Sequence, residues 1–154
     1  MSGVCSNSAV DLTKQFSEEQ FAHALDSWGW LSFAGRTPRF ASLFGDLFLE
    51  ADDGSWWFLD TFEGELSRPW ADRAAMDAVL ATEQGQDRYL MAGLAIGAYQ
   101  RRGLRPGPAQ IYAWAPPPML TGSFAADEIK VFGFVPVVHV AGQIHGQTRG
   151  RAAG

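Results

Sequence analysis

The sequence predicts a single α+β domain, with an antiparallel sheet of about four or five strands and about three principal helices. Short aromatic and aliphatic runs alternate with turn residues between positions 46 and 66, and apolar residues recur at helical spacing in three other segments. A chain of 154 residues that is 47% apolar can also bury one core without metals or disulfides. The predicted organisation is a flexible lead-in (1–15), the domain (16–148) and a frayed tail (149–154).

The first helix is predicted over residues 18–28. Ser17 suits the N-cap position, Gln20 completes a capping box, and the flanking phenylalanines are placed as a hydrophobic staple. Gly29 is expected to adopt the left-handed conformation that commonly ends a helix.

Residues 46–66 are predicted to form an antiparallel meander with tight turns at Gly54 and Gly64. The strand expected at residues 110–114 would join the same sheet. An antiparallel sheet is often half-exposed, so Trp56 and Phe58 would form a surface patch unless a helix covers them. Cover by a helix is the expected arrangement.

Two further helices are predicted in the middle of the chain. One follows Pro69 over residues 70–80, since proline is tolerated at a helix start. The other spans residues 87–102 and stops at Gly103.

The last third of the domain is predicted to be extended. The three prolines at 116–118 favour a polyproline-like segment. Residues 129–140 are rich in Val and Phe, which predicts a strand, with Gly133 and Pro136 marking a bulge or an edge position.

Composition narrows the class of protein. Cys5 is the only cysteine, which excludes an intramolecular disulfide and suits a reducing compartment. The sequence contains no signal-peptide pattern and no apolar run of membrane-spanning length, so a cytoplasmic protein without membrane contact is expected. The formal net charge of −5 repels phosphate backbones, which disfavours direct binding of nucleic acid.

Catalytic and cofactor motifs are absent from the sequence. It has neither a Gly-x-Ser-x-Gly elbow nor a phosphate-binding loop, and His139 and His145 are six residues apart, which matches no common zinc spacing. The sequence therefore predicts no enzyme activity, no metal and no cofactor.

Residues 46–65 contain seven acids and not one Lys or Arg. Such a segment could form an acidic face for a basic protein partner, or it could be an ordinary solvated hairpin. The acids predicted to bind the partner are Asp46, Glu50, Asp52, Asp53, Glu63 and Glu65. The loop at residues 116–124 is the alternative contact.

Six short motifs occur in order along the chain: Trp28-Gly29-Trp30, Phe44-Gly45-Asp46, Leu59-Asp60-Thr61, Gln110-Ile111-Tyr112, Pro116-Pro117-Pro118 and Gly142-Gln143-Ile144-His145-Gly146-Gln147. Together they resemble the DUF1851 family, which includes the Tdi1-type immunity proteins of bacterial type VI secretion. The resemblance covers residues 16–148, and Thr121 and Asp127 depart from the family pattern.

The resemblance implies a cytosolic immunity protein that binds and neutralises a cognate effector toxin, which in the best-known relatives is a DNase. Two alternatives stay open: an enzyme or small-ligand-binding protein, and a regulatory or scaffold domain. An enzyme would draw on the polar motif residues, whereas their commoner use is internal hydrogen bonding. These residues are Asp60, Thr61, Tyr112, Gln143, His145 and Gln147.

Overall fold

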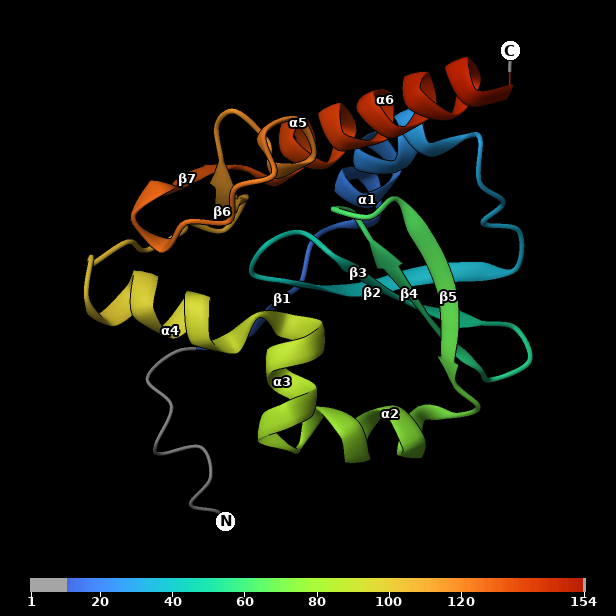
Figure 1. The fold of residues 1–154 in the computed structure, drawn as a ribbon. Helices are drawn as coiled ribbons and strands as arrows, with labels where there is room; N and C mark the ends of the chain where they lie inside the picture. The colour runs from blue at the N-terminus through green and yellow to red at the C-terminus, as the bar shows by residue number, and fades with distance from the viewer. Residues whose placement is uncertain (1–10, 154) are drawn as a thin grey trace.

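A five-stranded antiparallel sheet forms the centre of the molecule (Figure 1). The computed structural model describes residues 11–153, and Cys5 lies outside them. The strands pair in sequence order, which makes the sheet a continuous meander. They are β1 (Thr13–Lys14), β2 (Arg36–Ser42), β3 (Leu47–Ala51), β4 (Trp56–Asp60) and β5 (Glu65–Trp70).

The predicted meander at residues 46–66 is confirmed and is longer than expected. Gly54 and Gly64 have φ of 89° and 71°, values that glycine adopts without steric cost. Thr13 and Lys14, which the sequence places in the flexible lead-in, pair with Ser42 and Ala41 as an edge strand.

Helix α1 (Glu18–Leu25) begins where its capping signals place it. The Ser17 hydroxyl accepts a hydrogen bond from the Gln20 backbone N–H, and the Gln20 side chain accepts one in return from the Ser17 N–H. A 3₁₀ turn, η2 (Asp26–Trp28), continues the helix to the predicted end. Gly29 is right-handed, with φ of −62°, so the expected left-handed stop is wrong.

The middle helices differ from the prediction at their ends. Pro69 and Trp70 complete the edge strand β5, and α2 (Arg73–Leu80) starts later because the Asp72 carboxylate accepts a hydrogen bond from the Ala75 N–H. The single helix predicted over residues 87–102 is two helices, α3 (Glu83–Leu90) and α4 (Ala92–Gln100). Met91 separates them with a left-handed φ of 51°.

Strands β6 (Gln110–Trp114) and β7 (Ile129–Gly133) form a second antiparallel sheet. The expectation that residues 110–114 join the meander is therefore wrong, although the Tyr112 N–H donates to the Leu43 carbonyl between β2 and β3. The connection between β6 and β7 contains α5 (Pro118–Thr121) and the 3₁₀ turn η3 (Ala126–Glu128). Of the extended segment predicted at residues 116–118, Pro117 keeps a polyproline-like conformation, whereas Pro118 begins α5, so the prediction is wrong there.

Helix α6 (Phe134–Ala153) replaces the strand predicted over residues 129–140 beyond Gly133. Pro136 lies in its first turn, where the missing N–H removes no helical hydrogen bond. The helix continues through residues 149–153, the segment expected to be a frayed tail.

Helices cover both faces of the large sheet (Figure 1). Leu47, Leu49 and Leu59 pack against α1 and α6 on one face. On the other face, Trp56 and Phe58 are buried with residues of α2 and α3, so the predicted helical cover is confirmed and the half-exposed sheet is wrong. The molecule is an α+β domain of the predicted class. Among residues 11–153, no helix is both long and apolar enough to cross a membrane.

Candidate functional site

The acidic segment at residues 46–65 does not form one continuous surface. Asp52 and Asp53 lie in the turn before β4, whereas Glu63 and Glu65 follow its other end. These four side chains are exposed. The exposed charge is therefore divided between opposite ends of a strand.

Neighbouring strands supply cations that the segment itself lacks. The Nε of Arg39 on β2 lies 2.9 Å from Oε1 of Glu50. Hydrogen bonds from the Ser55 hydroxyl and N–H lower the pKa of Asp53, and Arg68 on β5 lowers it further. Pairing within the sheet thus offsets part of the negative potential predicted from the sequence.

Asp46 is buried, with 4% of its surface exposed, so its assignment to the partner-binding surface is wrong. Its Oδ1 accepts hydrogen bonds from the Thr61 N–H and hydroxyl, both at 2.8 Å. Burial and the nearby Asp60 carboxylate raise the pKa of Asp46 to about 8, and the bonds from Thr61 oppose the rise. Asp46 acts inside the fold, where it ties the start of β3 to the turn after β4.

The polar motif residues mostly make internal hydrogen bonds. Asp60 Oδ1 accepts from the N–H groups of Phe62 and Glu63, and the Tyr112 hydroxyl donates to the Leu104 carbonyl at 2.7 Å. Those bonds stabilise one turn and tie β6 to the preceding loop.

Gln143 and Gln147 are exposed on α6. The Gln143 amide lies 3.3 Å from the Nε2 of His139. For Gln147, the expected internal hydrogen bond is not found among residues 11–149, whose side chains the structure describes. The two amides therefore do not help to join α6 to the sheet.

Two glycines of α6 leave room for two tryptophans. A Cβ at Gly142 would lie 2.7 Å from the Trp28 ring and 2.2 Å from the Ser27 hydroxyl, and a Cβ at Gly146 would lie 3.0 Å from the Trp30 ring. The Trp28 indole N–H donates to the Val138 carbonyl, and that of Trp30 donates to the Gly142 carbonyl. The Trp-Gly-Trp motif and the motif at residues 142–147 are thus the two sides of one contact.

His145 and Arg149 attach the second half of α6 to the large sheet. The Nε2 of His145 lies 2.9 Å from the Thr61 carbonyl, and Arg149 donates to the Gly64 carbonyl at 2.7 Å. The imidazole also packs against Trp28, with ring centroids 5.8 Å apart. Because its nitrogen is engaged at Thr61, His145 is not directed toward His139.

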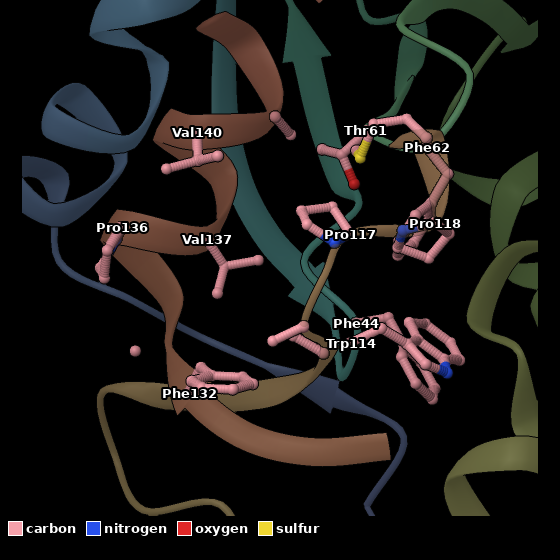
Figure 2. A pocket seen from close by; sticks show the side chains of 15 residues that line it. Phe44, Thr61, Phe62, Trp114, Pro117, Pro118, Phe132, Pro136, Val137 and Val140 are labelled. Carbon is pink, nitrogen blue, oxygen red and sulfur yellow. The ribbon is translucent and has the colours of Figure 1, made fainter. Parts of the chain in front are cut away.

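The first half of α6 forms one wall of an apolar groove of about 250 Å³. Figure 2 shows side chains of α6 on one side of the groove, and Pro117, Pro118 and Trp114 on the other. Phe44 and Thr61, from turns of the large sheet, also line the groove. The groove is lined by Phe44, Thr61, Phe62, Ala113, Trp114, Ala115, Pro117, Pro118, Met119, Phe132, Gly133, Pro136, Val137, Val140 and Ala141.

The lining side chains carry no charge, and their polar hydrogens are already donated. The Thr61 hydroxyl donates to Asp46, and the Trp114 indole N–H donates to the Ala125 carbonyl at 3.0 Å. The groove therefore offers shape and apolar contact rather than a catalytic group.

Exposed apolar side chains continue from the groove onto the surface. Val140 on its wall is 41% exposed, and Leu120 on α5 is 63% exposed. Phe124 is 41% exposed and packs its ring edge-on against Phe62 and Trp114. An apolar groove with an apolar margin is typical of a binding site.

Sequence reasoning identifies one side of this site and misses the other. The loop at residues 116–124 is the alternative contact, and it supplies Pro117, Pro118 and Met119. The α6 wall is missed because the composition of residues 134–140 predicts a strand. Pro136 is the available signal, since proline is common in the first turn of a helix.

Comparison with known proteins gives a likeness in fold. The crystal structure of Atu4351 from Agrobacterium tumefaciens superposes with a TM-score of 0.53 over 82% of this chain, at 17% sequence identity. This chain spans 62% of the length of that chain. No family model matches the sequence, and no curated protein matches it. At this identity the likeness concerns the fold alone.

Replacing His145 by Ala should destabilise the protein by about 1–2 kcal/mol, because the Thr61 carbonyl loses its partner and Trp28 loses a ring contact. Urea unfolding followed by tryptophan fluorescence measures the change. His139→Ala is the matched control on the same helix, and its effect should stay below about 0.5 kcal/mol. Equal effects of the two substitutions would contradict the role given to His145.

Asp46→Asn should change how stability depends on pH. In the wild type the unfolded carboxyl ionises near the ordinary aspartate pKa of 3.8, whereas the folded carboxyl holds its proton up to about pH 8. As the pH rises between these two values, the wild type should therefore lose stability relative to the variant, by at most about 1.4 kcal/mol per pH unit. Unfolding curves at several pH values measure the difference, and a difference independent of pH would show that Asp46 is ionised in the folded protein.

Proposed function

We propose that this chain is an immunity protein, which binds and neutralises a cognate type VI secretion effector in the bacterial cytosol. The observation that carries the proposal is the uncharged apolar groove between α6 and the residues around α5, with exposed apolar residues at its margin. The family resemblance supports the same function. The tryptophan and glycine residues of two family motifs seat the helix that forms the groove wall.

The arrangement of the polar motif residues supports a binding role over an enzymatic one. Asp60, Tyr112 and His145 hydrogen-bond to backbone groups, and none of them lines the groove. Thr61 does line it, but its hydroxyl donates to the buried Asp46. These interactions make Asp60, Thr61, Tyr112 and His145 supports of the fold, whereas Gln143 and Gln147 are exposed on α6.

A small apolar ligand is the second candidate for the groove. Its apolar lining supports this alternative, whereas its volume of about 250 Å³ lies below the roughly 300 Å³ at which ordinary ligand pockets begin. The exposed Leu120 and Phe124 favour a larger partner, since a ligand confined to the groove would leave them in water.

Charge supports a cationic effector. Glu63 and Glu65 follow Thr61 and Phe62, which line the groove, and a net charge of −5 attracts basic proteins at long range. If the effector is a nuclease, its DNA-binding surface must be cationic, and an acidic inhibitor can occupy that surface. Glu63 and Glu65, close in sequence to the lining residues Thr61 and Phe62, would raise the association rate, and apolar contact in the groove would slow dissociation.

The proposal predicts that a gene beside the one for this chain encodes the effector, and that effector is the partner to test. Purified effector domain and purified chain should form a stable complex, and co-expression should restore growth of a strain that produces the effector. Neither complex formation nor protection would be seen if the function is wrong.

Reversing the charge of Glu63 and Glu65 to Lys should slow association with that effector by about tenfold at low salt, with little change in dissociation. Stopped-flow or surface-binding kinetics measure both rates. The difference from wild type should shrink toward 1 M salt, where the Debye length is about 3 Å.

The matched control reverses Asp52 and Glu83, which are also exposed and give the same change in net charge. Asp52 lies at the opposite end of β4 from Glu63, so this pair should slow association less. An equal effect of the two pairs would mean that the association rate depends only on net charge, and that the positions of Glu63 and Glu65 do not matter.

A further inference from the structure

We infer that the groove receives one apolar side chain of the effector, of the size of Leu, Met or Phe, as the central anchor of the complex. This inference rests on the proposed function and adds the chemistry of the partner at that site. It follows from the lining of the groove, its rigidity and the exposed residues around it.

The lining selects an apolar occupant. None of the lining side chains is charged, and the two that carry a polar hydrogen, Thr61 and Trp114, donate it within the protein. A charged group placed there would lose its hydration and gain no partner, which costs several kcal/mol. An aliphatic or aromatic group loses only unfavourable contact with water.

The surroundings favour a side chain that belongs to a larger surface. Val140 lines the groove and Phe124 packs on the lining residues Phe62 and Trp114, and because both are 41% exposed the apolar area extends beyond the groove. A protein that inserts one side chain would cover this margin and exclude water around the anchor, which is the arrangement found at the centres of strong interfaces. A small molecule would fill the groove and leave the margin exposed.

Charge disfavours a second copy of this chain as the occupant. Each copy carries a net charge of −5, and like charge opposes association at long range. A cationic effector carries charge of the opposite sign, so the negative field of this chain attracts it. The occupant is therefore assigned to a different protein.

The walls of the groove are already held in place. Pro117, Pro118 and Pro136 have restricted backbones, and Trp114 is fixed by its hydrogen bond to Ala125. Helix α6 is seated on Trp28 and Trp30. A preformed site loses little entropy when an anchor enters, so removal of the anchor contact should appear mainly in the dissociation rate.

Val137→Trp tests the inference by filling the groove from within, because Val137 lines it from α6 (Figure 2). Dissociation of the effector domain should accelerate by at least about 30-fold, with association within about threefold of wild type. Thr148→Trp is the matched control: eleven residues, or about three turns, place it on the same side of α6 beyond the groove, where it is exposed. It should bind as wild type does.

Val140→Asp provides a second test that does not depend on tolerance of a large ring in the groove. Val140 is 41% exposed, so the fold should accept the carboxylate, which can be checked by circular dichroism. A charge at the margin of the groove should also accelerate dissociation. If both variants are folded and dissociate at the wild-type rate, the inference is wrong while the proposed function stands.

The neutral fluorophore N-phenyl-1-naphthylamine tests occupancy directly. It should bind the wild type and Thr148→Trp but not Val137→Trp, and the effector domain should displace it. Retention of the fluorophore in the complex would overturn the inference, as would a wild-type dimer that Val137→Trp converts to monomers. If the wild type forms no complex at all, the proposed function fails as well.

Discussion

The seating of α6 on Trp28 and Trp30 is the contact on which the rest of the structure depends. Gly142 and Gly146 allow the helix to approach both rings, and each indole N–H donates to a carbonyl of α6. Indole N–H groups removed from water usually find such partners, so here the same side chains supply packing and orientation. The position of α6 relative to the large sheet is thereby set.

The two halves of α6 have different roles at the groove. Its first half presents Pro136, Val137 and Val140 to the groove, while His145 in its second half reaches the Thr61 carbonyl. Thr61 in turn binds the buried Asp46 through its N–H and hydroxyl. His145 and Thr61 thus help to position the α6 wall of the groove, and of the two only Thr61 also lines it.

Local signals make part of the fold predictable, and non-local contacts decide the rest. The capping box at Ser17 and the glycine turns of the meander act within a few residues, so the sequence shows them directly. In α6, by contrast, β-branched residues favour a strand, and packing on tryptophans more than 100 positions earlier overrides that preference. The charge of the acidic segment is overestimated from sequence for the same reason, because Arg39 and Arg68 reach it from neighbouring strands.

Hydrogen exchange of the chain alone and in complex with the proposed effector's domain tests the central claim most directly. Binding at the groove should protect amides in residues 111–124 and in the first half of α6. The turn at residues 52–55, at the far end of β4, should exchange as in the free chain. Protection confined to that turn, with none around the groove, would contradict the account.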